Sequence, residues 1–339
     1  MKEIQEGKCQ REIEHCVNLC IKKGDLNPKS IGYGRFPFAN CNLTHHPFRK
    51  KKWNYWAITS PDAIFSATIA NADYLGLVGV SLLDIGSQKV TECGIATPLG
   101  VGCNMPQKAN QSVAFKMHGL KVSFIEEKGY TLITVDSLKL KAELKVFMPV
   151  GYQTLNVVVP WSKRRFQFTS KQTCLPVEGW VKAGDKVYNF NPSSSFGSLD
   201  FGRGIWPYRT TWNWANASGI ENGHMIGLNL GGLWTDGTGA NENGLILDGK
   251  LIKYCDDVVF NYDPHDFMKT WTIKSVQTDS VDLLFTPFYE RKANVNIIVL
   301  KSETHQLFGY FSGTIKTECG EVLAINHLLG WAEEYIGRW

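Results

Sequence analysis

The densest group of residues able to do chemistry lies between positions 198 and 219. It combines aromatic rings with charged and amide side chains: Asp200, Arg203, Trp206, Tyr208, Arg209, Trp212, Asn213 and Trp214. Tryptophan supplies a large apolar surface, while its indole N–H needs an acceptor. This combination indicates a ligand cavity with a few polar anchors, in which Asp200 and Tyr208 are candidate catalytic groups. The alternative is an aromatic core that closes a barrel around a structural Asp200–Arg203 ion pair.

A second group, between positions 231 and 244, sets further side chains among five glycines: Trp234, Asp236, Asn241, Glu242 and Asn243. Glycine at this density lets a ligand or another segment approach the backbone closely. If Asp200 and either Asp236 or Glu242 face one apolar pocket, their environments can leave one carboxyl protonated and the other ionised. These three are the catalytic carboxyl candidates, and Trp234 and Asn243 are candidate ligand contacts. Asp236 and the glycine after it also suit a plain hairpin turn.

A third candidate segment, residues 168–181, places Lys171 and Glu178 near Trp180. A lysine in an apolar pocket can lose its proton and act as a base, or it can hold an anionic group of a ligand. Lys171 and Glu178 are therefore candidate ligand-binding residues. The alternative is a lysine at a strand edge and a solvated glutamate.

The sequence predicts neither a metal site nor a cofactor. Five of the eight histidines are isolated, without the spacing of a ligand pair: His118, His224, His265, His305 and His327. No glycine-rich phosphate-binding pattern lies between a strand and a helix. Cys9, Cys16, Cys20 and Cys41 include one pair with the spacing of zinc ligands, Cys16 and Cys20. Residues 1–30 are interpreted as a thiol-containing leader, with a zinc site as the alternative.

Charge and hydropathy limit the classes of partner that the chain is expected to bind. The 36 basic and 32 acidic residues give a net charge of +4, and the excess lies mainly in two short runs, 49–52 and 163–165. Without a recognisable reading module, such runs are typical of solvated loops, so we expect a small-molecule ligand and no nucleic acid. The amino terminus is charged, and no apolar run reaches the roughly 18 residues of a membrane span. We expect a cytoplasmic protein whose nine cysteines remain thiols.

The elements that must position these residues are strands. Short runs of β-branched and aromatic residues, divided by glycine, asparagine and proline, recur from position 53 to 159 and again from 225 to 314. Amphipathic segments long enough for βαβ units are missing, which favours an all-β fold of two successive antiparallel, lipocalin-like barrels or sandwiches. The expected organisation is a leader over 1–30, one β domain over 31–195 and a second over 196–339. Residues 326–339 have the spacing of a short C-terminal helix.

Several phrases resemble the bacterial family called domain of unknown function 2804. They are residues 169–171, 175–179, 200–208, 212–214, 234–239 and 242–243, together with 49–56 and 329–334. The family is similar to two-domain lipocalin-like proteins, a group that includes carotenoid hydratases, tocopherol cyclase and fungal cyclisation catalysts. In those relatives an acid in an aromatic pocket protonates an olefin or orients a polyene. The resemblance implies that Asp200 is the acid and that Trp206, Trp212 and Trp214 form the walls.

Three functions follow. The leading hypothesis is an acid-catalysed isomerase, hydratase or cyclase of an isoprenoid-like or lipid-like molecule. The second is a carbohydrate-active hydrolase or lyase that uses paired carboxylates, since aromatic platforms also suit sugar rings. The third is a carrier of a small apolar ligand, which needs the aromatic lining without proton transfer.

Overall fold

The computed structural model describes residues 9–297 and 300–338, and their architecture is all β. Consecutive strands form antiparallel hairpins through tight turns. Asn222 and Gly223 have φ values of 50° and 83°, and Asp248 and Gly249 have values of 48° and 77°. Left-handed backbone at both central residues matches the twist of the flanking strands, so these pairs form two-residue hairpins. In the described part, no helix is long and apolar enough to cross a membrane.

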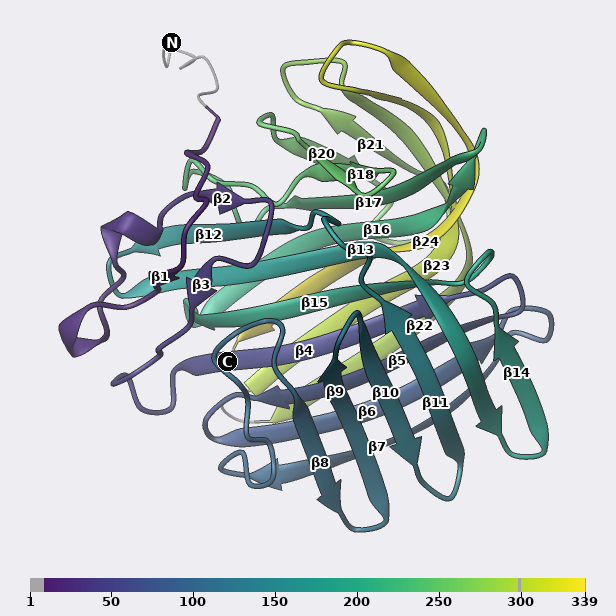
Figure 1. The fold of residues 1–339 in the computed structure, drawn as a ribbon, viewed down its shortest axis with the longest axis horizontal. Coiled ribbons are helices and arrows are strands. Elements are labelled where there is room, and N and C mark those ends of the chain that lie inside the picture. Colours follow the sequence, from purple (N-terminus) through teal and green to yellow (C-terminus); the bar gives the residue numbers. More distant parts are fainter. Residues whose placement is uncertain (1–8, 298–299, 339) are drawn as a thin grey trace.

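The first sheet has 13 strands, in the order β7-β6-β5-β4-β15-β13-β11-β10-β9-β8, with β2, β12 and β14 beside this path (Figure 1). Its strands are β2 (Tyr33–Gly34), β4 (Lys50–Thr59), β5 (Ala63–Asn71), β6 (Leu75–Asp84), β7 (Lys89–Pro98), β8 (Val113–Met117), β9 (Leu120–Glu127), β10 (Tyr130–Asp136), β11 (Leu140–Phe147), β12 (Leu155–Ser162), β13 (Arg165–Ala183), β14 (Lys186–Phe190) and β15 (Phe196–Ile205).

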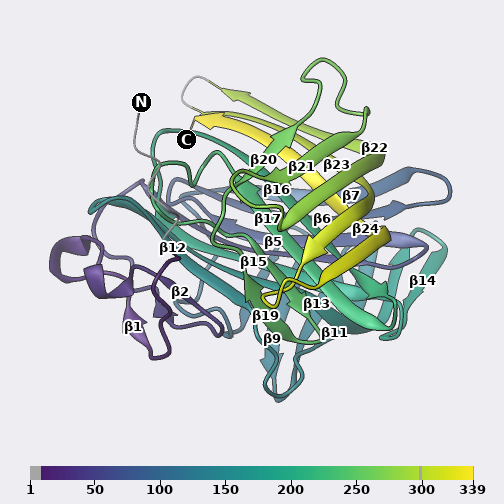
Figure 2. The same cartoon turned by 90° about the horizontal axis from the view of Figure 1, so that it is seen from above.

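The second sheet has nine strands, in the order β19-β18-β17-β16-β24-β23-β22-β21-β20. Its strands are β16 (Arg209–Glu221), β17 (His224–Gly232), β18 (Gly244–Leu247), β19 (Lys250–Lys253), β20 (Val258–Asn261), β21 (Trp271–Ser275), β22 (Val281–Ile297), β23 (Leu300–Lys316) and β24 (Val322–Arg338). Each sheet curls into an antiparallel half-barrel, which confirms the expected all-β, two-part fold (Figures 1 and 2).

The long strand β13 ties the two arms of the first sheet together. Its first half pairs with β12 and β15, and its second half pairs with β11 and β14. The register against β15 shifts between Gln172 and Leu175, where Cys174 has a φ of 62°. Such an irregularity bends a strand. Lys171 therefore lies just before the bend.

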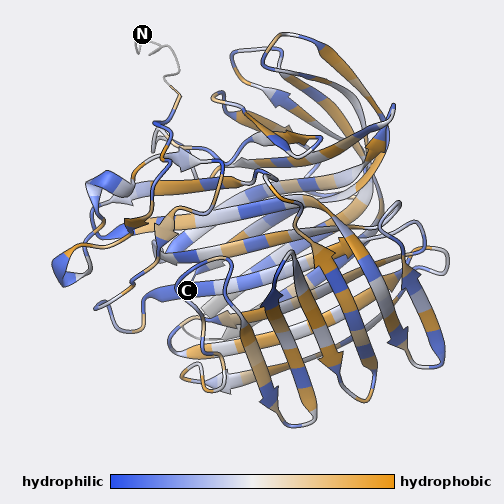
Figure 3. Ribbon diagram, in the orientation of Figure 1, coloured by the Kyte–Doolittle hydropathy of each residue, from blue (hydrophilic) through white to orange (hydrophobic). Residues whose placement is uncertain are grey.

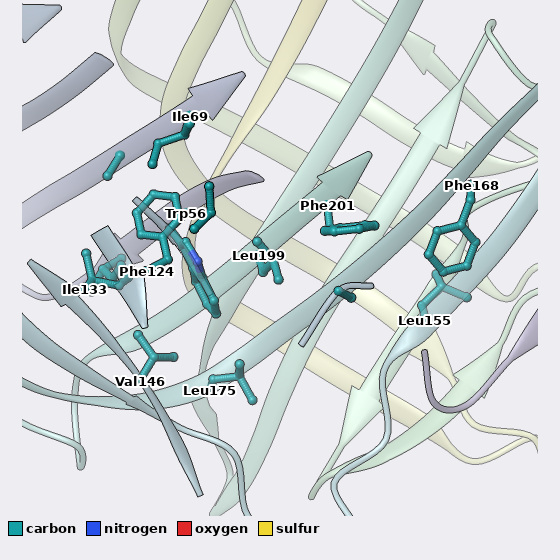
Figure 4. Close-up of a cluster of buried hydrophobic side chains, with 14 of the residues drawn as sticks. Trp56, Ile69, Phe124, Ile133, Val146, Leu155, Phe168, Leu175, Leu199 and Phe201 are labelled. Atoms are coloured by element: carbon teal, nitrogen blue, oxygen red, sulfur yellow. The ribbon is translucent and has the colours of Figure 1, made fainter. Parts of the chain in front are cut away.

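Apolar side chains fill the interior of each half-barrel. Along β8–β11, hydrophilic and hydrophobic residues alternate (Figure 3), as expected for strands with one buried face. Trp56, Phe124, Leu175 and Leu199 lie together in the core of the first sheet, and Phe201 lies farther along it, beside Phe168 (Figure 4).

A separate cluster joins the two sheets. Its buried members come from β4, β5 and β6 of the first sheet and from β16, β23 and β24 of the second: Ala57, Ile64, Leu83, Trp214, Phe308 and Trp331. Buried apolar area of this kind stabilises the contact by roughly 25 cal/mol per Å². The two half-barrels therefore share an apolar junction.

The expected C-terminal helix is wrong. Residues 326–338 belong to the strand β24, and Trp339 lies outside the described residues. Leu328, Trp331, Ala332 and Tyr335 are buried at intervals that imitate a helical stripe. The true cause is burial on both faces, since Gly330 to Glu333 alternate between the faces of the strand and are all buried. A strand covered on both sides loses the alternation that identifies it.

The chain leaves the first sheet at the end of β15 and enters the second at β16. The expected division between residues 195 and 196 stays a prediction.

The N-terminal segment lies against the first sheet (Figure 1), where β1 (Val17–Asn18) pairs in parallel with β3 (Ala39–Asn40). Two 3-10 turns, Lys22–Gly24 and Pro28–Ser30, follow β1. Residues 1–8 of the expected leader lie outside the described residues.

Cysteine pairing differs from expectation, because Cys9 forms a disulfide with Cys255. The prediction of nine free thiols is wrong for this pair. Cys16 is exposed, while Cys20 and Cys41 are buried free thiols. Within the described residues, no group of three or more His, Cys, Asp or Glu side chains could hold a metal ion.

Candidate active site

One face of the first sheet carries a polar stripe. Lys171 on β13 lies opposite Asp200 on β15, which lies opposite Tyr55 on β4. Alternate residues of a strand point to the same side, so Thr169 and Gln167 share the face of Lys171. All except Tyr55 line a cavity of about 220 Å³ at the junction with the second sheet. The full lining is Trp53, Ala70, Gln167, Thr169, Lys171, Asp200, Trp206, Trp212, Trp214, Trp234, Glu242 and Glu333.

An ammonium group bridges two carboxylates at the centre of this stripe. Lys171 Nζ lies 3.1 Å from Asp200 Oδ1 and 3.3 Å from Glu242 Oε2. It also lies 4.1 Å from the ring centre of Trp214. The Lys171 and Glu242 side chains are only 6% and 2% exposed. Because Glu242 follows β17, this contact connects the first sheet to the second half of the chain.

A third carboxyl, Glu333 on β24, enters the cavity from the second sheet. Its Oε1 accepts a hydrogen bond from Trp212 Nε1 at 2.9 Å, and its Oε2 accepts one from Gln306 Nε2 at 3.1 Å. Gln306 also donates to the Tyr55 hydroxyl at 3.3 Å. Burial raises the pKa of Glu333 to about 7. This carboxyl can therefore hold a proton near neutral pH.

Each carboxyl of the cavity accepts an indole N–H. Trp53 donates to Asp200 Oδ2 at 3.0 Å, Trp234 donates to Glu242 Oε1 at 3.0 Å, and Trp212 donates to Glu333 as described. Asp200 Oδ1 also accepts the Thr169 hydroxyl at 3.2 Å. The tryptophans therefore form the apolar wall and orient the acids in the same contact.

The indole rings pack against one another as well. Trp206 lies at the centre, with ring-centre distances of 4.7 Å to Trp161, 5.3 Å to Trp234 and 5.7 Å to Trp212. Trp212 is stacked on Tyr335 at 3.7 Å. Aromatic faces carry partial negative charge, so such a wall attracts positive charge inside the cavity.

Glycines let these large side chains approach the sheet. A Cβ on Gly202 would lie 2.1 Å from the Trp53 ring, and one on Gly204 would lie 2.2 Å from Gln167 Oε1. A Cβ on Gly231 would lie 2.3 Å from Glu242 Oε1. Side chains at these three positions would displace the residues that build the site.

The charges of the site do not balance if every group is ionised. Among the described residues that line the cavity, three carboxyls face one ammonium group. Burial raises the pKa of Glu242 as well, although Lys171 opposes that rise. Burial lowers the pKa of Lys171, but Asp200 and Glu242 outweigh it, so the net pKa is raised. Lys171 therefore stays a cation, and a carboxyl is the group that takes up a proton.

The family can now be assigned. A family model described as "Domain of unknown function (DUF2804)" matches residues 10–339. The chain belongs to this family. A search of curated proteins found no match for it.

Solved structures that are similar to the DUF2804 chain include two proteins from different organisms. A Nitrosomonas europaea protein with the provisional designation ATTH superposes with a TM-score of 0.52 at 10% identity, covering 86% of this chain and 93% of the other. Kievitone hydratase from Nectria haematococca gives a TM-score of 0.46 at 10% identity, covering 85% and 88%. At 10% identity, the similarity to the Nitrosomonas europaea protein concerns the fold alone.

The structure of the DUF2804 chain brings seven of the sequence-predicted site residues around the cavity. They are Lys171, Asp200, Trp206, Trp212, Trp214, Trp234 and Glu242. The remaining six do not line it: Glu178, Arg203, Tyr208, Asn213, Asp236 and Asn243.

Three of these six are exposed. Tyr208 is 46% exposed, at the turn between the two sheets. Asp236 is exposed on the glycine-rich loop, and Glu178 is exposed on β13 opposite Lys145. Of the two alternative partners for Asp200, Glu242 therefore lines the cavity and Asp236 does not.

The other three are buried and hold the structure together. Arg203 donates to the Trp53 carbonyl and to Asn54 Oδ1, and Asp200 pairs with Lys171 instead, so the Asp200–Arg203 ion pair of the alternative interpretation does not form. Asn243 Oδ1 accepts the Gly231 N–H, which anchors the loop that carries Glu242. Asn213 donates to the Tyr262 hydroxyl and to a backbone carbonyl of β24.

Sequence patterns did not identify Trp53, Gln167, Thr169 and Glu333 as lining residues. Trp53 and Glu333 lie within two of the segments that resemble the family, 49–56 and 329–334. That resemblance was the signal in the sequence that could have identified them as site residues. Gln167 and Thr169 share the face of Lys171, so the alternation of a strand through that lysine would have found them.

Proposed function

We propose that the chain is an enzyme that uses acid catalysis in an apolar pocket, as an isomerase, hydratase or cyclase of an isoprenoid-like or lipid-like small molecule. The observation that carries this proposal is a tryptophan-walled cavity lined by three carboxyls and one ammonium ion, which lies within 3.3 Å of two of the carboxyls. A site with surplus carboxyls retains a proton at neutral pH. The apolar wall selects a substrate that water does not solvate well.

Glu333 is the proposed proton donor, in place of Asp200. Both Asp200 oxygens already accept from donors, namely Lys171, Trp53 and Thr169. Burial raises the pKa of Glu333 to about 7. An acid with a pKa near the working pH combines protonation with a ready transfer.

The proposed step moves the Glu333 proton to one carbon of a substrate C=C bond. The π electrons form the new C–H bond, Glu333 becomes a carboxylate, and the adjacent carbon becomes a cation. The faces of Trp206 and Trp212 and the negative charge of Asp200 stabilise that cation. Hydration follows when water attacks the cation and gives up a proton to the Glu333 carboxylate. Cyclisation follows when a second C=C bond attacks the cation and the new cation loses a proton to Glu333. Loss of a different proton from the first cation to Glu333 gives isomerisation.

The carbohydrate alternative fits the geometry less well. Paired carboxylates of glycosidases face each other across the scissile bond of a sugar. Here the space between Asp200 and Glu242 holds the Lys171 ammonium, within 3.3 Å of both. A sugar ring placed between them would have to displace the lysine.

Deuterium transfer tests this proposal before the substrate is identified. Molecules that co-purify with the protein are identified by native mass spectrometry and organic extraction, from the wild type and from Trp212→Ala. The extract is then incubated in D2O with wild-type protein, Glu333→Gln or Asp200→Asn. We expect deuterium in one apolar compound with the wild type and at least a hundredfold slower incorporation with Glu333→Gln.

The other outcomes separate the alternatives. A ligand that binds the wild type and Asp200→Asn equally, without deuterium uptake in either, would identify a carrier. A co-purified sugar, or affinity for oligosaccharides, would support the carbohydrate enzyme.

A further inference from the structure

Gln167 presents an unused donor inside the cavity. Its side chain is 0% exposed, and its Oε1 accepts a hydrogen bond from Trp206 Nε1 at 2.7 Å. An indole N–H can only donate, so this contact fixes which end of the amide is the oxygen. The Nε2 group is buried and has no hydrogen-bond partner within the described residues.

The amide nitrogen points along the polar stripe. A Cβ on Gly204 would meet Gln167 Oε1, whereas a Cβ on Gly202 would lie 2.6 Å from Nε2. Gly202 lies next along β15 in the direction of Asp200, opposite Thr169. The donor is therefore turned toward the interior of the site, and its oxygen is turned toward Trp206.

Other hydrogen-bond donors of the cavity lining already have acceptors. Thr169 and Trp53 donate to Asp200, Trp234 donates to Glu242, and the Lys171 ammonium bridges two carboxylates. A buried N–H without an acceptor costs free energy, and a ligand acceptor would recover it. The unpaired amide N–H of Gln167 thus selects for an oxygen on the ligand.

We propose that Gln167 binds a hydroxyl or carbonyl oxygen of the ligand, so that the natural substrate is an oxygenated apolar molecule and not a pure hydrocarbon. This inference rests on the proposed function, because it assumes that the cavity takes an apolar small molecule. Gln167 sets the orientation, with the oxygen of the substrate at Gln167 and its reacting carbons elsewhere in the same cavity.

The test compares two probes of similar shape, acetophenone as the ketone and cumene as the hydrocarbon. Isothermal titration calorimetry measures both dissociation constants for the wild type, Gln167→Met and Gln167→Leu. Both variants remove the NH2 group and add no ionisable group to the cavity. We expect the wild type to favour acetophenone about tenfold, and both variants to lose that preference while still binding cumene.

Gln172 on the same strand provides a matched control. It is also a buried glutamine, but its Nε2 donates to Asn110 Oδ1 at 3.0 Å and it does not line the cavity. Gln172→Met should keep the tenfold preference.

Equal binding of both probes by the wild type, or an unchanged preference in both Gln167 variants, would overturn the role of Gln167 and leave the proposed acid catalysis intact. Binding of neither probe would overturn the apolar pocket itself, and this inference with it.

Discussion

Glu333 and Trp212 come from neighbouring strands of the second sheet, and the indole N–H of Trp212 donates to Glu333 Oε1 at 2.9 Å. The same contact aims the proposed acid and forms part of the wall that faces the substrate. Glu333 cannot move without disturbing Trp212, which is stacked on Tyr335. The position of the proton donor and the shape of the apolar wall therefore depend on each other.

Glu333 should make stability depend on pH. Burial raises its pKa from the usual 4.5 to about 7 in the folded protein. The folded state therefore holds this proton more tightly than the unfolded state, and stability falls as pH rises from about 4.5 to about 7. The shift corresponds to about 3 kcal/mol. We expect Glu333→Gln, which cannot ionise, to gain about that much relative to the wild type between pH 4.5 and pH 8.

Urea unfolding at several pH values provides the measurement. The quantity to follow is the difference in unfolding free energy between Glu333→Gln and the wild type, because other titrating groups cancel in it. A difference that stays constant across this range would show that Glu333 is ionised in the folded protein and would remove it as the acid.

Lys171→Met should be strongly destabilising. The substitution keeps most of the side-chain volume but leaves Asp200 and Glu242 without the cation that bridges them. Removing one partner of a buried ion pair typically costs about 3–5 kcal/mol. We expect a loss of this size in urea unfolding at pH 7, with part of it recovered at low pH as the carboxyls take up protons.

Lys269→Met is the matched control. Lys269 also pairs with an aspartate, Asp263, at 2.7 Å, but its side chain is 61% exposed. Water and salt screen an exposed pair, so its loss should change stability far less than the loss of the buried pair. If the two variants lost equal stability, the buried cluster would not have the importance assigned to it.

Local patterns allowed much of the fold to be predicted, because turn residues and β-branched runs act over a few positions. The part that failed was β24, where both faces are covered and the buried residues at 328, 331, 332 and 335 imitate helical spacing.

The site could be predicted only in pieces. Lys171, Asp200 and Glu242 were each candidates, yet nothing in their separate segments shows that one ammonium bridges both carboxylates. Register between β13 and β15 and the path of the glycine-rich loop create that contact. The alternative interpretation paired Asp200 with Arg203, but residues an odd number apart on a strand point to opposite faces.

The Cys9–Cys255 disulfide links the N-terminal segment to the loop between β19 and β20. A bridge of this kind typically contributes about 2–4 kcal/mol. We expect Cys255→Ser to lose about that much in urea unfolding under non-reducing conditions, whereas Cys319→Ser, which removes an exposed free thiol, should change stability by less than about 0.5 kcal/mol. Peptide mapping without reductant provides the direct check, and recovery of both cysteines only as thiols would contradict the bridge.

Gly202→Ala should damage the cavity through a single methyl group. A Cβ at this position would lie 2.1 Å from the Trp53 ring and 2.6 Å from Gln167 Nε2. Trp53 must then move, which breaks its hydrogen bond to Asp200 and opens the wall. We expect at least a tenfold weaker affinity for acetophenone and a loss of about 1–3 kcal/mol in stability from overpacking.

Gly79→Ala makes the same change on β6, where a Cβ would meet nothing within 4 Å. It should leave both affinity and stability close to the wild type. Calorimetric titration and urea unfolding of the two variants side by side separate a local effect on the site from the general effect of adding alanine to a strand. Equal affinities for Gly202→Ala and the wild type would mean that Trp53 does not wall the ligand cavity.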